Sequence, residues 1–465
     1  MLNRLLIFSA SLLAVLPAAV TQAAPVHPEA ESEALELAKQ AISLRSVQGS
    51  GNETPKVAAL YKRTLIGYGF AEKDVEITPF EDTAYLIARW PGSDPSLKPL
   101  VISGHMDVVE ARREDWQRNP FEAIIEKGFL FGRGASDTKL NNALAIASIG
   151  ELKRQGYRPR RSIIIEFSGD EETSMKTSEI IAQKLRNAEL VLNTDGGGGR
   201  LDEATGQPKY FTWAGAEKIY ANFEMTVTNP VGHSSQPRKI NAITELSAAL
   251  VRIGTHQFKP KLNDITRASL SRLAMYEDPK MAAAMRAFVA DPGNSQAVET
   301  LTANTATIGT IGTTCVVTMI NGGHDRSALP QRATANINCR IFPGQKPAEI
   351  MTELEKVANN PSISFKALPD GTVLADASPM RADVVAAIEK SIHEVYPGIP
   401  VTPVQLSGAT DSAYFRQVGV PAYGIAPTFN KVSDSFAHGL NERIPIMNIR
   451  PAITYYLSLF RALSK

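Results

Sequence analysis

This chain of 465 residues has little cysteine, no excess of either charge and few long apolar runs. Two cysteines cannot build the framework of a disulfide-rich scaffold. The 49 basic and 48 acidic residues give a formal net charge of +1, so there is no electrostatic case for binding nucleic acid or an anionic membrane. Beyond Ala19, no stretch is long and apolar enough to span a bilayer. The length favours a globular protein of two or three domains.

The N-terminus has the three parts of a secretory signal. Arg4 carries a positive charge, residues 5–19 are almost wholly apolar, and Thr21-Gln22-Ala23 offers small residues where a signal peptidase reads. A retained membrane anchor is the alternative, but the apolar stretch is short for a membrane span. We expect residues 1–23 to be removed as a signal peptide, and the mature protein to be exported, either periplasmic or secreted.

The two cysteines, Cys315 and Cys339, lie in strand-like runs that could pair within one sheet. An oxidising compartment would permit a disulfide between them. We expect instead two buried small apolar side chains, with a cross-strand disulfide as the alternative.

Buried strands alternate with helices in the first part of the chain. Residues 100–104 and 161–167 contain apolar residues at consecutive positions, as in strands covered on both faces, and residues 139–155 between them have the composition of a long helix. This alternation predicts an α/β fold whose mixed, mostly parallel sheet is flanked by helices. The same texture returns near the C-terminus, with a helix at 382–395 and a strand at 421–425.

The pattern of apolar and polar residues changes near Gly215. Residues 219–228 alternate between apolar and polar, as a strand with one exposed face does. Residues 258–305 are rich in Ala, Met and charged residues and predict a helical insertion. We therefore predict a discontinuous catalytic domain, residues 24–215 and 371–465, interrupted by an α+β lid or dimerisation domain at residues 216–370.

Five acidic and histidine residues follow predicted strands or turns at distant places in the chain: His105, Asp137, Glu172, Asp195 and His438. Each segment alone has an ordinary explanation, such as a capping aspartate, a turn or a solvated acidic loop. Together they offer one imidazole and one terminal carboxylate for each of two metal ions, and one carboxylate to bridge them. The set predicts a metal-dependent hydrolase.

Two neighbouring residues extend this set. Asp107 points the same way as His105 along an extended chain, so it can accept the other imidazole N–H and fix the tautomer. Of the adjacent pair Glu171 and Glu172, one carboxylate can bind a metal ion while the other handles the proton of a bound water.

The segments G-H-M-D-V-V, G-R-G-A-S-D-T-K, G-D-E-E-T, T-D-G-G, G-H-S-S-Q-P and A-H-G-L-N-E-R occur in this order. As an ordered set they resemble the M20 family of metallopeptidases, which includes carboxypeptidase G2-like, carboxypeptidase S-like and aminoacylase enzymes. The match extends from near Glu31 to the C-terminus. The resemblance implies a zinc-peptidase-like catalytic domain with an inserted lid.

The resemblance also implies individual roles. Asp137 would bridge the ions, Glu171 would be the general base, and Asp107 would orient His105. The peptide bond from Asp137 to Thr138 would be cis. The remaining ligands would divide between the two sites, His105 and Asp195 in one, Glu172 and His438 in the other.

Three further residues match substrate-binding positions of the family. His233 matches a histidine that, in dimeric members, reaches the partner's active site and steadies the oxyanion. Arg340 matches an arginine that binds a substrate carboxylate, for which the planar guanidinium is suited. Gly408 matches a glycine near the substrate backbone. Whether His233 acts within one chain or across a homodimer depends on the oligomeric state.

We therefore predict a metallopeptidase of carboxypeptidase or dipeptidase type that cleaves an amide bond of a small peptide or N-acyl amino acid. Water between two ions, activated by Glu171, would attack the bond. Zinc is favoured because mixed nitrogen and oxygen sites bind it strongly, with cobalt or manganese as alternatives. The inserted domain would offer a surface for a homodimer. An aminoacylase or deacylase is the alternative enzyme, and a non-catalytic periplasmic binding protein is disfavoured by the intact metal set.

Overall fold

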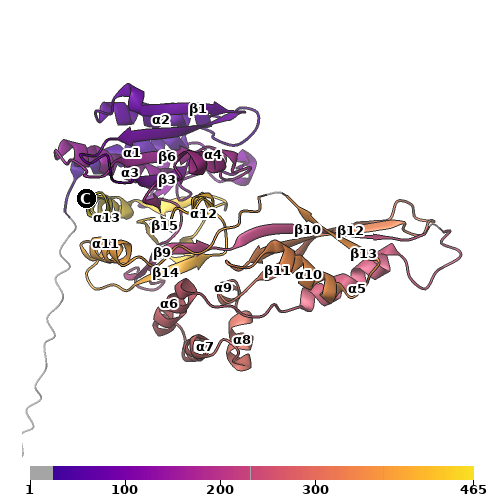
Figure 1. Cartoon of the computed structure of the whole chain (residues 1–465). Helices are drawn as coiled ribbons and strands as arrows, with labels where there is room; N and C mark the ends of the chain where they lie inside the picture. Colours follow the sequence, from indigo (N-terminus) through magenta and orange to yellow (C-terminus); the bar gives the residue numbers. More distant parts are fainter. Residues whose placement is uncertain (1–24, 231, 370) are drawn as a thin grey trace, which may run out of the picture.

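The computed structural model describes residues 25–230, 232–369 and 371–465, so the predicted signal peptide lies outside the described residues. A rounded body carries a narrow arm that extends to one side (Figure 1). The body contains a ten-stranded sheet and the arm a four-stranded sheet. Within the described ranges, no helix combines the length and hydrophobicity needed to cross a bilayer.

The body sheet has the order β1-β2-β6-β3-β7-β15-β9-β8-β16, with β14 paired to β9. Its central strands β6, β3, β7 and β15 are parallel, and antiparallel pairs lie on either side, which confirms the mixed α/β sheet. The strands are β1 (Val75–Phe80), β2 (Thr83–Trp90), β3 (Leu100–His105), β6 (Ile163–Ser168), β7 (Leu190–Asn193), β8 (Gly198–Leu201), β9 (Pro208–Glu217), β14 (Val401–Leu406), β15 (Ala422–Gly424) and β16 (Phe429–Asn430).

Helices cover both faces of this sheet, which explains why its central strands are apolar at consecutive positions. On β3, Leu100 and Ile102 belong to one core, whereas Val101 belongs to the core on the opposite face. The first core is covered by α1 (Pro28–Ile42), α2 (Thr54–Gly67), α3 (Lys139–Arg154), α11 (Ala382–His393) and α13 (Ile449–Leu463). The second is covered by α4 (Lys176–Lys184) and α12 (Ser412–Gln417). A small sheet of β4 (Ile124–Glu126), β5 (Phe129–Phe131) and β17 (Arg443–Pro445) completes the body.

The arm is an antiparallel sheet with one face covered by two helices. Its strands, in the order β11-β12-β10-β13, are β10 (Ile219–Thr228), β11 (Thr314–Gly322), β12 (Arg332–Ile341) and β13 (Ile363–Leu368). Leu246 of α5 (Ala242–Thr255) and Leu354 of α10 (Pro347–Ala358) pack with Phe223 and Ile337 of the strands. The alternate positions, including Tyr220 and Asn222 on β10, therefore lie on the face that these helices leave open.

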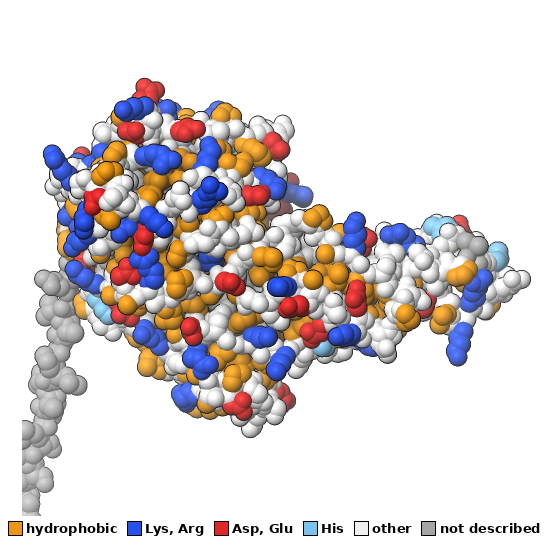
Figure 2. Space-filling model, viewed as in Figure 1, with side chains coloured by type: hydrophobic (Ala, Val, Ile, Leu, Met, Phe, Trp, Pro, Cys, Tyr) orange, Lys and Arg blue, Asp and Glu red, His pale blue; other side chains and the backbone are white. Residues whose placement is uncertain are grey.

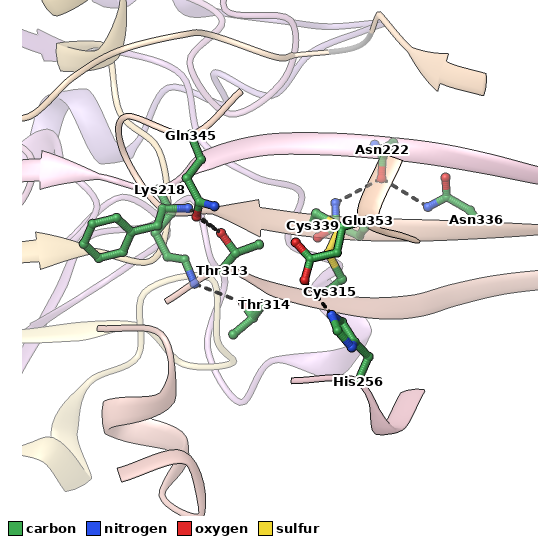
Figure 3. The surroundings of a disulfide bond; sticks show 12 residues. Lys218, Asn222, His256, Thr313, Thr314, Cys315, Asn336, Cys339, Gln345 and Glu353 are labelled. Carbon is green, nitrogen blue, oxygen red and sulfur yellow. Dashed lines mark hydrogen bonds and ion pairs between the residues drawn. A yellow bond between two sulfur atoms is a disulfide. The ribbon is translucent and has the colours of Figure 1, made fainter. Parts of the chain in front are cut away.

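The two cysteines form a disulfide, so the expectation of two buried thiols is wrong. Cys315 on β11 and Cys339 on β12 are directly opposite each other in the antiparallel register, with their Cα atoms 4.1 Å apart (Figure 3). Opposed positions on neighbouring antiparallel strands bring the two Cβ atoms close, which makes the bridge sterically accessible.

The predicted helical insertion is confirmed as four helices, and it lies against the body. Ile265 of the first helix is part of the body's core, and the Arg272 side chain donates to the main-chain oxygen of Val401 on β14. The helices are α6 (Asp264–Leu273), α7 (Pro279–Ala290), α8 (Ser295–Thr302) and α9 (Thr305–Ile308).

Candidate metal centre

The predicted ligands meet because β3, β6 and β7 are adjacent and parallel. Their carboxyl ends share one edge of the sheet, where ligands collect in open α/β folds. His105 ends β3, Glu172 lies in the loop after β6, and Asp195 lies in the turn after β7. Asp137 arrives just before α3, and His438 comes from the loop before β17.

Asp137 lies between the two imidazoles. Its Oδ1 is 3.1 Å from His105 Nε2, and its Oδ2 is 3.1 Å from His438 Nε2. His438 Nε2 is also 3.0 Å from Glu172 Oε2. Each carboxylate oxygen of Asp137 thus faces a different histidine, as a carboxylate that bridges two ions would. The peptide bond from Asp137 to Thr138 is cis, as the resemblance implied.

Three overlapping groups of donor atoms could each hold a metal ion: His105 with Asp137 and Asp195, Asp137 with Glu172 and His438, and His105 with Glu171 and Glu172. Within each group the donor atoms lie within 4.8 Å of one another. The first two groups share Asp137 and reproduce the predicted division of ligands. Mixed imidazole and carboxylate donors suit zinc and related divalent ions, so these residues fit a dinuclear centre.

The pKa shifts of the site residues also favour a cation-binding site. Burial and the negative charge of Asp137 raise the pKa of Asp195 to about 8, and burial raises the pKa of Glu171 well above its ordinary value. Hydrogen bonds with Asp137 and Glu172 raise the pKa of His438 to about 10. The imidazolium forms thus neutralise part of the acidic cluster, a role that divalent cations fill more completely.

Asp107 lies beside the other imidazole nitrogen of His105, as predicted, and its carboxylate has a further role. His105 Nδ1 lies 3.0 Å from the main-chain oxygen of Asp107 and 3.5 Å from its carboxylate. The two carboxylate oxygens of Asp107 instead accept the backbone N–H groups of Glu171 at 3.1 Å and Glu172 at 2.9 Å. The Asp107 main chain orients the imidazole, and its side chain anchors the loop after β6.

The third acid of that loop has a structural task. Asp170 accepts the backbone N–H groups of Lys176 at 2.8 Å and Thr177 at 3.0 Å, at the start of α4. Its negative charge there complements the positive end of the helix. Of the three consecutive carboxylates, only Glu171 and Glu172 are directed to the candidate metal centre.

Glu442 is the site residue that the sequence did not reveal. It is fully buried, and its carboxylate accepts the backbone N–H groups of Gly134 at 3.0 Å, Ser136 at 2.7 Å and Asp137 at 3.0 Å. An ion pair of 2.7 Å with Arg133 balances its charge. Glu442 therefore fixes the glycine-containing loop that carries the central carboxylate. Its place four positions after His438 was the only signal available.

The three residues predicted to contact the substrate lie in different parts of the molecule: one on the body, one where the arm adjoins the body, and one at the far end of the arm. Gly408 follows β14 on the body, and Arg340 lies near the end of β12 that adjoins the body. His233 is exposed in the loop after β10, at the far end of the arm (Figure 1), where it forms an isolated bridge with Ala328. Within one chain, the structure does not bring His233 to the five candidate ligands.

Comparison with known proteins finds relatives that are similar over most of the chain. The protein is 29% identical over 408 residues to the N-fatty-acyl-amino acid synthase/hydrolase PM20D1 of Homo sapiens, covering 86% of this chain and 80% of that protein. It is 26% identical to the probable carboxypeptidase S-like 2 of Dictyostelium discoideum, covering 82% of this chain and 74% of the relative.

Solved structures share the fold. The M20 family metallo-carboxypeptidase Sso-CP2 from Sulfolobus solfataricus superposes with a TM-score of 0.70 at 21% identity, over 93% of this chain and 99% of that one. The dinuclear metal binding peptidase YXEP of Bacillus subtilis gives a TM-score of 0.57 at 12% identity, over 92% and 97% of the two chains. Residues 101–462 match the family described as Peptidase family M20/M25/M40, and the chain therefore belongs to this family.

Proposed function

We propose that this protein is a dinuclear-metal amidohydrolase that cleaves an amide bond of a small peptide or an N-acyl amino acid. The observation that carries the proposal is Asp137, whose two carboxylate oxygens face His105 and His438 on opposite sides. Glu172 and Asp195 complete the two donor sets. When bound, two divalent cations, of which we favour zinc, lower the pKa of a water molecule and stabilise developing negative charge on oxygen.

Glu171 is the proposed general base. Burial raises the pKa of the Glu171 carboxyl, which makes the carboxylate a stronger base toward the attacking water. The carboxylate takes the proton of the attacking water and delivers it to the nitrogen that leaves as an amine. Asp107 accepts the backbone N–H groups of both Glu171 and Glu172, so it fixes the position of the proposed base relative to Glu172.

The relatives support two neighbouring substrate classes. PM20D1 is named a synthase/hydrolase of N-fatty-acyl amino acids, and the Dictyostelium relative a carboxypeptidase. Both names describe an amide bond beside an amino acid. A carboxypeptidase or dipeptidase activity and an aminoacylase activity are therefore the two alternatives, and a direct assay separates them.

The test is metal reconstitution followed by a substrate panel. Metal-stripped protein is loaded with zinc, cobalt or manganese, its bound metal is counted by elemental analysis, and dipeptides are assayed beside N-acyl amino acids. We expect about two ions per chain and turnover of at least one substrate class. Function that persists after chelation, or a loaded protein that cleaves no member of the panel, would refute the proposal and revive the binding-protein alternative.

Export is a second part of the proposal. The signal-like pattern of residues 1–23 supports it, and the Cys315–Cys339 disulfide is of the kind that persists in oxidising compartments. Cell fractionation, with the N-terminus of the mature protein read by mass spectrometry, tests both cleavage near Ala23 and localisation. An intact N-terminus in the cytosolic fraction would contradict it.

We also propose a homodimer formed through the arm. Figure 2 shows hydrophobic side chains exposed along the arm, and the edge strand β11 contributes Val316, Met319 and Ile320 with exposures of 58%, 69% and 61%. A second copy would cover this edge, since an exposed apolar edge strand otherwise favours aggregation. In such a dimer His233, exposed at the end of the arm, would act at the partner subunit's site, as the resemblance implied.

A further inference from the structure

The main chain passes between the body and the arm at two places. Lys218 lies between β9 of the body and β10 of the arm, and the segment after β13 returns the chain to α11 of the body. Domains commonly rotate about the ends of strands and about loops, because only a few residues have to change their backbone angles there. These two crossings alone would therefore allow the angle between the arm and the body to change.

The helical insertion is a third link between the two parts. It leaves the arm after α5, forms the helices α6 to α9, and re-enters the arm at β11 (Figure 1). Its helices have a core of their own, in which Leu270, Phe288 and Ile311 are at most 2% exposed. Because packed cores deform little, the insertion has a fixed shape. A unit of fixed shape that is attached to both the arm and the body would set their relative position.

Helix α6 attaches the insertion to the body. The Ile265 side chain is 1% exposed and belongs to the body's core, and its Cδ1 lies 2.7 Å from the position that a Cβ at Gly215 of β9 would take. At the start of the helix, Asn263 Nδ2 donates to Gln405 Oε1 of β14 at 3.0 Å. At the end of the helix, the Arg272 side chain donates to the main-chain oxygen of the first residue of β14. Three contacts along its length thus fix α6 on the sheet of the body.

Both ends of the insertion are anchored in the arm. At the first end, Phe258 packs against the arm's core, and His256 Nε2 lies 2.8 Å from Glu353 Oε1 of α10 (Figure 3). At the second end, Thr313 Oγ1 donates to Gln345 Oε1 at 2.7 Å, just beyond β12 (Figure 3). Side chains of the arm therefore hold the chain where it enters the insertion and where it leaves.

The two connections between the insertion and the arm are short, and they are bonded to each other. The Lys261 backbone N–H donates to the main-chain oxygen of Ile311 at 2.8 Å. Ile311 belongs to the insertion's core, and β11 begins shortly afterwards at Thr314. The disulfide between Cys315 and Cys339 then fastens this end of β11 to β12. Little chain is left in which the insertion could rotate relative to the arm.

We propose that the helical insertion holds the arm at one fixed angle to the body. A rotation of the arm about the two crossings would have to separate α6 from β9 and β14, which exposes the Ile265 side chain to water at a cost in free energy. Arg340 on the arm and Gly408 on the body therefore keep a constant separation. If the proposed function holds, a substrate that contacts both residues finds them already in place, without closure of the arm.

Distances between a spin label on the arm and one on the body test the proposal. The labels are attached at Lys366→Cys of β13 and Gln183→Cys of α4, two exposed positions. The two native cysteines are joined in the disulfide, so they do not react with the label. Dilution with unlabelled protein restricts the measurement to distances within one chain. We expect wild type to give one narrow distance distribution that does not shift when zinc and an N-acyl amino acid are added.

The double variant Ile265→Ala, Arg272→Ala removes two contacts of α6 with the body. Its distance distribution should broaden and its mean should shift. Its KM should rise about three- to tenfold, because only the molecules at the competent angle bind substrate, with a smaller change in kcat. Arg286→Ala, which replaces an exposed arginine of α7, is the matched control and should retain the wild-type distribution. Circular dichroism checks that the variants keep their helices.

Three results would overturn the proposal: a broad or two-peaked distribution in wild type, a wild-type distance that shifts when the ligand is added, or a double variant that keeps the wild-type distribution. The last result would mean that the two crossings alone fix the angle. If the double variant does not fold, Arg272→Ala alone decides in the same way, because it leaves both cores intact. The distances are read without turnover, so a wild type that cleaves no substrate refutes the proposed function and leaves this test valid.

Discussion

The Asp137 backbone N–H donates to Glu442 Oε1 over 3.0 Å, which joins the central carboxylate of the metal centre to a residue far away in the sequence. The same oxygen accepts the Ser136 N–H at 2.7 Å, and the other oxygen accepts the Gly134 N–H at 3.0 Å. The metal loop is thus built around a buried carboxylate that is not itself a candidate ligand.

Glu442→Gln should weaken metal binding. An amide has one acceptor oxygen in place of two, and it leaves the buried Arg133 without its counterion. We expect a tenfold to hundredfold loss of metal affinity, as is typical for residues that support ligands. Competition with a chromophoric chelator measures it, with the exposed Glu277→Gln as control. Equal affinities in both variants would mean that the loop keeps its shape without Glu442.

Glu171→Gln and Glu172→Gln should fail in different ways although the residues are adjacent. Loss of the base should reduce kcat by about a hundred- to ten-thousandfold with metal content unchanged. Loss of Glu172, which lies 3.0 Å from His438, should lower the metal content itself. Elemental analysis and initial rates on the same preparations separate the two effects. Wild-type turnover by Glu171→Gln would show that another group carries the proton.

Removing the disulfide should destabilise the arm. The bridge closes a loop with a sequence separation of 24 residues. For a loop of this size the chain-entropy estimate is a loss of about 3 kcal/mol in the free energy of unfolding. The double variant Cys315→Ser, Cys339→Ser should show this loss in denaturant titrations under oxidising conditions. In excess reductant, wild type and variant should converge, and a difference that persists there would assign the effect to side-chain packing.

Lys218 should give stability a measurable pH dependence. Folding lowers its pKa from the ordinary value of 10.5 to about 7. Between these values the unfolded chain binds more protons than the folded one, so the free energy of unfolding rises with pH. Among the described residues, the charged side chain that contributes to the lowered pKa of Lys218 is Arg340. Its guanidinium stays protonated over this pH range.

The matching measurement is denaturant unfolding of wild type and Lys218→Met from pH 6 to pH 10. The stability of wild type relative to the variant should increase by up to about 1.4 kcal/mol per pH unit above pH 7. Parallel pH profiles for the two proteins would contradict the lowered pKa.

A charge on the edge strand should separate the proposed dimer. Met319 on β11 is 69% exposed, and Met319→Arg places a cation where the second copy would pack. Light scattering should report the mass of a monomer, with turnover reduced if His233 acts across the interface. Met447→Arg on the body, where Met447 is 63% exposed, is the control. If the wild-type protein is monomeric at micromolar concentration, the proposed homodimer is wrong.

The sequence predicted the elements whose patterns are local and strong. The apolar runs of β3 and β6 and the alternation of β10 appear in the structure nearly as expected. Strands β9 and β14 were not predicted, because Gly215 and Pro403 interrupt their local patterns and both strands depend on pairing with distant parts of the chain.

The sequence predicted the residues that meet at the candidate metal centre, but not the residues that support them. His105, Glu172 and Asp195 come together because the ends of β3, β6 and β7 converge, a property of the fold class, whereas Asp137 and His438 arrive from loops before α3 and β17. The disulfide depended on the register of β11 against β12, and the task of Glu442 on a contact between distant segments. Neither is encoded in a local pattern.

The anchoring of two consecutive amides by Asp107 has a consequence for redesign. Asp107 holds the backbone of both Glu171, the proposed general base, and Glu172, a proposed metal ligand, so neither residue can be moved without moving the other. New chemistry at this centre would have to keep their spacing, or replace the whole turn together with the aspartate.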